Sequence, residues 1–186
     1  MSVMRSTVVS KALGALLVAP FIFALTTAAD AADDKAITLK AGINYLTNKG
    51  ARDATGDTGI HLGAGYALPT GSLLAPGQGV GSVDLTYNRN KSGDDKIEVW
   101  GLSYNERIRS YSAGGPSDFY YGLGVGLFNV DVRRTTSSDD KTKIGFNALL
   151  GYDLSETTFI EAGYSLMGKV NGLSGDSIVV SIGVRL

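Results

Sequence analysis

The chain ends in the stretch Ser177-Ile178-Val179-Val180-Ser181-Ile182-Gly183-Val184-Arg185-Leu186, where large apolar residues alternate with others up to the last position. Successive side chains of a strand point to opposite sides, so the apolar residues of this stretch would share one face. Such a face needs an apolar layer or an apolar solvent to cover it. A small or polar opposite face is typical of membrane-barrel strands, which have lipid outside and a polar lumen inside. The apolar face comprises Ile178, Val180, Ile182, Val184 and Leu186.

The beginning of the chain has the features of a secretory signal peptide. Two basic residues precede an apolar run from Ala12 to Leu25, and small residues follow. The run is shorter than the roughly 20 residues that span a bilayer, which disfavours a membrane anchor. The small-x-small rule allows cleavage after Ala29 or after Ala31, and we favour the second site. The predicted organisation is a signal peptide over residues 1–31 and one domain over residues 32–186.

Charge and composition argue against several classes of protein. The chain has 17 Lys and Arg against 18 Asp and Glu, so it lacks the basic surplus of nucleic-acid-binding proteins. It has no cysteine, which excludes disulfides and a cysteine nucleophile, and its single histidine excludes a multi-histidine metal site. We therefore expect no catalytic residues, no metal and no cofactor.

Seven further segments alternate in the same way, and clusters of Gly, Asp, Asn, Ser, Lys and Pro separate them. In one segment Ile97 and Val99 compete in phase with Trp100, Leu102 and Tyr104, and we take the second set as outward, because small and polar residues then share a face. The total of eight fits the even strand number of bacterial barrels, and each segment is long enough to cross a bilayer at a tilt. We predict an all-β fold, an eight-stranded antiparallel up-and-down transmembrane β-barrel. The segments cover residues 36–47, 58–68, 80–90, 96–109, 118–131, 141–152, 158–168 and 176–186.

The connections alternate in composition. Those after the odd-numbered segments are rich in charge, Ser and Gly, whereas the other three have few charges, and two of them contain Pro. This alternation predicts polar loops outside the cell, with the chain starting and finishing in the periplasm. The connection from Pro69 to Gly79 is longer than a periplasmic turn requires, and the sequence gives no reason for it. The polar loops are residues 48–57, 91–95, 133–140 and 169–175.

Aromatic residues gather at two levels when the strands are placed alternately outward and back. Two rows of this kind are typical of membrane proteins, because amphipathic rings favour the depth of the headgroups. The outer row contains Tyr45, Tyr87 and Trp100, and the inner row contains Tyr66, Phe119, Tyr121 and Tyr152.

Five charged residues lie on the inward face by phase: Lys40, Asp84, Arg107, Glu161 and Arg185. Three cations and two carboxylates at one level would pair across the lumen, with Glu161 and Asp84 as candidate partners of Arg185. An eight-stranded barrel is barely wide enough for its own side chains, so the pairs would close the interior. The alternative is a narrow ion path gated by a change of partners.

Two polar features carry weaker functional signals. His61 would suit a lipid-modifying enzyme only on the outer face, and its phase places it inside. The loop carboxylates Asp94, Asp95, Asp139 and Asp140 lie beside lysines, where a divalent ion could bridge them to lipopolysaccharide phosphates. We interpret them instead as a solvated rim.

The signal peptide, the eight segments, the charged outer loops and the terminal strand together resemble the small outer-membrane β-barrel proteins. The resemblance is to the transmembrane domain of outer-membrane protein A and its porin-like relatives. It implies location in the cell outer membrane, contact with outer-membrane lipid and lipopolysaccharide, insertion by the barrel-assembly machinery, a monomer and no nucleic-acid partner. Such barrels commonly end in an aromatic residue, whereas this chain ends in Leu186.

These patterns lead to a functional expectation with two alternatives. The expected function is a non-enzymatic barrel that supports envelope integrity or surface interactions. The alternatives are a small porin-like pore for ions or small solutes and a lipid-modifying enzyme of the outer membrane.

Overall fold

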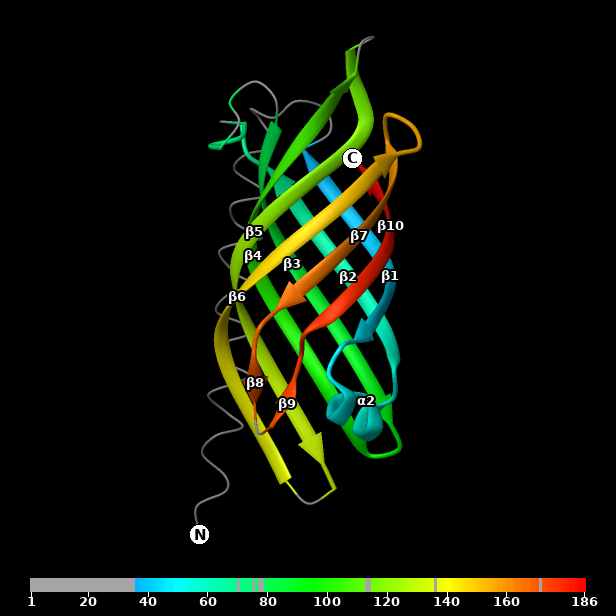
Figure 1. Cartoon of the computed structure of the whole chain (residues 1–186), viewed down its shortest axis with the longest axis vertical. Coiled ribbons are helices and arrows are strands. Elements are labelled where there is room, and N and C mark those ends of the chain that lie inside the picture. Colours follow the sequence, from blue (N-terminus) through cyan, green and yellow to red (C-terminus); the bar gives the residue numbers. More distant parts are fainter. Residues whose placement is uncertain are drawn as a thin grey trace. The chain divides into compact units, whose positions relative to one another are not determined.

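Eight antiparallel strands close a barrel in the computed structural model, in the order β1-β10-β7-β6-β5-β4-β3-β2 (Figure 1). The structure describes residues 36–69, 71–74, 76, 79–112, 115–135, 137–170 and 172–186, without the side chains of residues 111–117. The predicted fold is confirmed, and the predicted signal peptide lies outside the described residues. No helix within the described ranges is long and apolar enough to span a bilayer.

Each of the eight predicted segments corresponds to one barrel strand. The strands are β1 (Ile37–Leu46), β2 (Thr58–Ala67), β3 (Gly79–Ser92), β4 (Asp95–Ser112), β5 (Gly115–Arg134), β6 (Ser137–Asp153), β7 (Thr158–Leu166) and β10 (Ser177–Arg185). Strands β3 to β6 extend well beyond the predicted limits, so the connections β3–β4 and β5–β6 are tight turns.

The terminal strand closes the barrel against the first. Strand β10 pairs with β1 from Thr38–Arg185 to Leu46–Ser177, and its other edge pairs with β7. The last residue takes part, since the Leu186 N–H donates to the Ile37 carbonyl at 2.8 Å. The β1–β10 closure therefore satisfies the backbone of both strands along their whole paired length.

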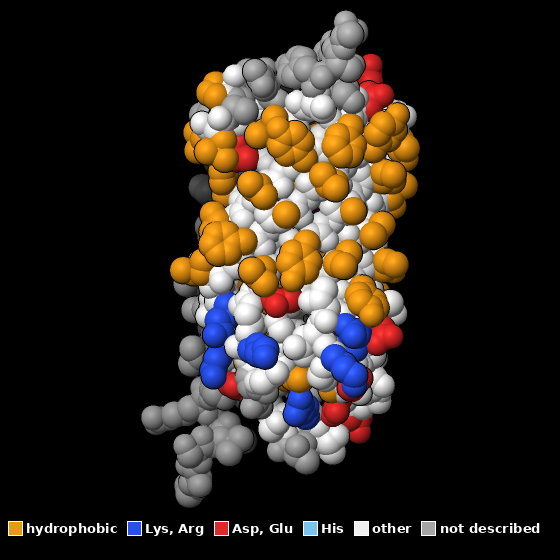
Figure 2. Space-filling view, viewed as in Figure 1, with side chains coloured by type: hydrophobic (Ala, Val, Ile, Leu, Met, Phe, Trp, Pro, Cys, Tyr) orange, Lys and Arg blue, Asp and Glu red, His pale blue; other side chains and the backbone are white. Residues whose placement is uncertain are grey.

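Side chains alternate between the outer surface and the interior as the sequence predicted. On β10, Ile178, Val180 and Ile182 are exposed between buried neighbours. On β4, Trp100 is exposed while Val99 is buried, so the phase assigned to this strand is confirmed. Every barrel strand carries exposed apolar side chains, and on the face shown in Figure 2 they form a band with lysines and arginines beyond its lower edge.

The apolar face changes sides where β4 and β5 leave this band. On β5, Leu127 is exposed, but Phe128, Val130 and Val132 beyond it point inward and are buried. Outside the membrane the surrounding solvent is water, so apolar side chains are stable only on the inner face. The inversion therefore marks the edge of the apolar band at the end predicted to be extracellular.

Two of the predicted polar loops contain ordered structure that the sequence patterns did not indicate. Helix α2 (Lys49–Thr55) lies between β1 and β2, and a hairpin of β8 (Lys169–Val170) and β9 (Leu173–Ser174) lies between β7 and β10. Both lie at the lower end in Figure 1, which the loop composition predicts to be the extracellular end.

Local interactions explain the limits of the helix. Asn48 caps it, accepting the Ala51 N–H at 3.0 Å. The helix ends at Gly56, whose φ of +84° favours glycine.

We expect a charge on the outer face of β10 to destabilise the protein in lipid. Ile182 pairs with the outward residues Ala41 and Ile160, and Ile182→Arg should lower the free energy of unfolding by about 2–4 kcal/mol if it lies near the bilayer midplane. Urea unfolding in lipid vesicles measures this change. Ile182→Leu is the matched control, and equal stability of the two variants would contradict the assigned orientation.

Candidate functional site

A cluster of four charged side chains crosses the lumen between strands β1, β3, β4 and β7. Lys40 Nζ lies 2.7 Å from Glu161 Oε1, and Arg107 lies 2.8 Å from Asp84 Oδ2 and 3.3 Å from Glu161 Oε2. The two cations and two carboxylates balance in charge. The structure thus brings together four of the five inward charges predicted from the sequence.

Neutral side chains add hydrogen bonds to this charge cluster. Asn105 donates to Asp84 at 2.6 Å, the Tyr120 hydroxyl donates to Glu161 at 3.3 Å, and Arg107 also donates to Ser82. Burial of a charge is costly unless it is paired and hydrogen-bonded, and here each carboxylate has several donors. The cluster is a fixed cross-brace of the lumen.

Arg185 is not part of this cluster, contrary to the partners expected from the sequence. It donates to Asp153 Oδ1 at 2.6 Å and stacks over the ring of Phe159, and Arg109 lies 2.7 Å from the other Asp153 oxygen. Because β6 continues one residue further than predicted, Asp153 falls on the inward face opposite Phe159 of β7, and Arg185 reaches it across that strand from β10. Extending the alternation of β6 by one residue would have found it.

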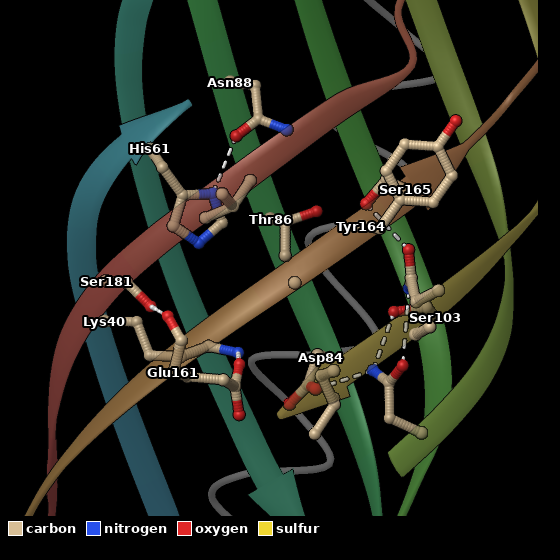
Figure 3. Close-up of a pocket in the computed structure, with 16 residues that line it drawn as sticks. Lys40, His61, Asp84, Thr86, Asn88, Ser103, Glu161, Tyr164, Ser165 and Ser181 are labelled. Atoms are coloured by element: carbon tan, nitrogen blue, oxygen red, sulfur yellow. Dashed lines mark hydrogen bonds and ion pairs between the residues drawn. The ribbon is translucent and has the colours of Figure 1, made fainter. Parts of the chain in front are cut away.

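Beside the charge cluster lies a cavity of about 50 Å³, lined by Lys40, Asp84 and Glu161 of the cluster and by uncharged polar side chains such as Asn88 and Ser103 (Figure 3). His61 lies here, 5% exposed, with its Nδ1 atom 2.7 Å from the Asn88 side-chain oxygen. Next to it, Asn44 donates to Asn90 at 2.8 Å. The inward position predicted for His61 is confirmed.

The extracellular mouth is filled by an apolar cap. Strands β4 and β5 contribute the inward residues beyond the apolar band, and α2 and the β8–β9 hairpin cover them at the mouth of the barrel. Asp176 holds the base of the hairpin by accepting the backbone N–H groups of Met167 at 2.6 Å and Gly168 at 3.0 Å. The buried residues of the apolar cap are Leu46, Ala51, Ile97, Val99, Phe128, Val130, Val132, Met167, Val170 and Leu173.

Aromatic side chains of both predicted rows lie on the outer face. In the outer row Tyr87 and Trp100 pack with ring centroids 4.6 Å apart, and the Tyr87 hydroxyl donates to Glu98 at 3.0 Å. In the inner row, Phe119 and Tyr152 are neighbours across β5 and β6 and are exposed. Of the remaining members, Tyr45 and Tyr121 are exposed and Tyr66 is half-buried.

The loop carboxylates are engaged locally. Asp139 pairs with Lys141 at 3.3 Å, and Asp95 accepts the backbone N–H of Thr135 at 2.8 Å. Among the described side chains, no group of three or more His, Cys, Asp or Glu residues is placed to hold a metal ion.

The closed eight-stranded meander and its apolar outer band define an outer-membrane β-barrel fold. Among solved structures the chain is similar to neisserial surface protein A (NspA), at 21% identity and a TM-score of 0.55, covering 81% of this chain and 94% of that one. It is also similar to the Yersinia pestis attachment invasion locus protein, Ail. The Ail crystal structure is 13% identical with a TM-score of 0.51, covering 83% of this chain and 100% of that one. The Ail structure in a phospholipid nanodisc is 12% identical with a TM-score of 0.51, covering 82% and 99%.

At these identities the likeness establishes the shared fold. No protein-family model and no curated protein sequence matches the chain.

We expect Glu161→Gln to destabilise the barrel, because Lys40 would remain buried without its carboxylate partner. The expected loss in free energy of unfolding is about 3 kcal/mol, the low end of the range for breaking a buried pair. The low end applies because Arg107, the other partner of Glu161, keeps its ion pair with Asp84. The double variant Lys40→Met/Glu161→Gln removes both charges and should recover part of this loss. A double-mutant cycle by urea unfolding measures the coupling.

The control is Asp53→Asn, which removes the exposed i,i+4 pair between Lys49 and Asp53 on α2. This change should alter stability by less than about 1 kcal/mol. A loss for Glu161→Gln no larger than that of the control would contradict the bracing role of the charge cluster.

Proposed function

We propose that this protein is a non-enzymatic, monomeric outer-membrane barrel with a closed lumen, which acts through its extracellular surface. In this proposal the barrel-assembly machinery inserts it, and outer-membrane lipid and lipopolysaccharide surround it. The support comes from the fold, the apolar band and the closed interior.

The observation that carries the proposal is closure of the lumen at two levels. The charge cluster braces the interior between β1, β3, β4 and β7, and the apolar cap fills the extracellular mouth. A conducting path would have to pass a level where apolar side chains pack together and a level where paired charges span the lumen. This arrangement favours a closed barrel over the porin-like alternative.

The position of His61 favours a non-enzymatic role over a lipid-modifying one. An enzyme acting on membrane lipid needs its proton-transferring group within reach of the lipid-facing surface. His61 instead points into the lumen and is hydrogen-bonded to Asn88.

The surface that supports an interaction role is the outward face of β3, β4 and β5 beyond the outer aromatic row, here termed the extracellular sheet. Its side chains are charged and tied to one another: Arg89 and Lys96 lie 3.5 and 2.5 Å from Glu98, and Arg133 lies 2.9 Å from Asp131. The tight turns and the apolar cap behind it make the sheet rigid, which lowers the entropy cost of binding. In this proposal the cations next to the membrane edge contact lipopolysaccharide phosphates. Proteins of this fold named surface protein A and attachment invasion locus protein add support for a surface role.

Conductance across planar bilayers tests the closed lumen. We expect the purified protein to insert without producing unitary current steps, while a general-diffusion porin in the same bilayer serves as the positive control. Reproducible unitary steps that change in size with Glu161→Gln would overturn closure and support the pore alternative.

Attachment of cells that produce the protein to a cultured epithelial monolayer tests the surface role. We expect the double charge reversal Arg89→Glu/Arg133→Glu to lower attachment several-fold, because it inverts exposed charge on the extracellular sheet. Lys49→Glu on α2, 82% exposed, is the matched control and should leave attachment unchanged. Unchanged attachment for the double variant, together with increased vancomycin sensitivity in cells lacking the protein, would favour an envelope-integrity role instead.

A further inference from the structure

A carboxylate on the lipid-facing side of the barrel marks a second interaction surface. Glu106 follows Trp100, Leu102 and Tyr104 in the outward phase of β4, yet it is only 2% exposed. A charged side chain that faces lipid is destabilising, so a covering group is required. The connection between β2 and β3 provides it.

The β2–β3 connection folds back over the outer wall instead of turning tightly at the barrel end. The Leu73 N–H donates to Glu106 Oε1 at 2.7 Å, and the Tyr104 hydroxyl donates to the same carboxylate oxygen. To reach β4, residues 71–73 must cross the outer face of β3. We call residues 71–74, held by Glu106, the periplasmic clasp.

Two glycines of β3 make room for this crossing. A Cβ atom at Gly81 would lie 2.7 Å from both the Gly71 carbonyl oxygen and the Tyr104 hydroxyl, and one at Gly79 would lie 3.0 Å from the Ser72 Cβ. The backbone is tied down at the same point, because the Gly81 N–H donates to the Gly71 carbonyl at 3.1 Å. Gly71 itself has a φ of +70°, which favours glycine. The crossing is therefore a specific docked structure.

The periplasmic clasp presents two adjacent leucines. Leu73 and Leu74 are 67% and 71% exposed, among the highest values for large apolar side chains in the described part of the chain. They lie next to Tyr104, so they continue the apolar band of the barrel. Water is a poor solvent for two such side chains, whereas the acyl chains next to the band are not.

We propose that the periplasmic clasp is a membrane anchor whose Leu73 and Leu74 insert among the phospholipid acyl chains of the periplasmic leaflet, with Glu106 fixing the anchor to the barrel wall. This inference also explains the length of the β2–β3 connection, since a tight turn cannot cross β3 to reach β4. It rests on the proposed insertion of the barrel in a membrane.

Tryptophan fluorescence in phosphatidylcholine vesicles carrying bromine on the acyl chains tests the anchor. Trp100 is the only tryptophan of the chain, so Trp100→Phe/Leu74→Trp reports on position 74 alone. We expect blue-shifted emission and roughly a twofold loss of fluorescence in brominated vesicles, as for a ring at the membrane interface. Adding Glu106→Ala should return the emission to that of a ring in water. Trp100→Phe/Ser155→Trp, in the exposed β6–β7 turn, is the matched control and should remain unquenched.

The outcomes separate the anchor from barrel insertion. Quenching of native Trp100 together with water-like emission at position 74 would overturn the anchor and leave the proposed function standing. Absence of quenching of Trp100 would overturn insertion itself. Blue-shifted emission at position 74 that ignores bromine and grows with the protein-to-lipid ratio would identify a second copy as the occupant and would also overturn the anchor. The change in gel mobility on heating verifies that each variant is folded.

Discussion

A backbone N–H or C=O group without a partner costs several kcal/mol in hydrocarbon, and pairing between β1 and β10 removes this cost at the only place where the meander would otherwise have open edges. The register of this closure also determines the faces. Because side chains alternate with a period of two, a slip of one residue would turn Ile182 into the lumen and Arg185 toward lipid. The apolar band and the inward charges both depend on this single register.

The surroundings of the strands change along their length from hydrocarbon to water. The outward-facing side chains change accordingly from apolar to polar. Within the apolar band of β5, Leu127 faces out and Gly126 faces in. A few residues further, Val130 faces in and Asp131 faces out, with no change in the backbone ladder. The periplasmic clasp shows the same rule at the other end, since Glu106 is compatible with the outer face only because backbone donors cover it.

The narrow interior decides how the lumen is filled. Eight strands leave room for side chains and a small polar cavity, so any inward charge must find its partner within the barrel. Lys40 pairs with Glu161, and Arg107 pairs with Asp84 and Glu161. Arg185 at the end of β10 pairs with Asp153. The extracellular mouth is equally narrow. The short helix α2 and the small β8–β9 hairpin are therefore enough to complete the apolar cap.

The sequence alone determined the number of strands, the order of the meander and the orientation of most side chains, because each depends on local alternation and on turn residues. It also placed Lys40, Asp84, Arg107 and Glu161 on one face. It did not determine the partner of Arg185, the apolar cap or the clasp over Glu106. These depend on which residues far apart in the chain come together, such as Leu73 and Glu106 in the clasp or Val99 and Leu173 within the apolar cap. Only the tilt and register of the closed barrel bring such residues together.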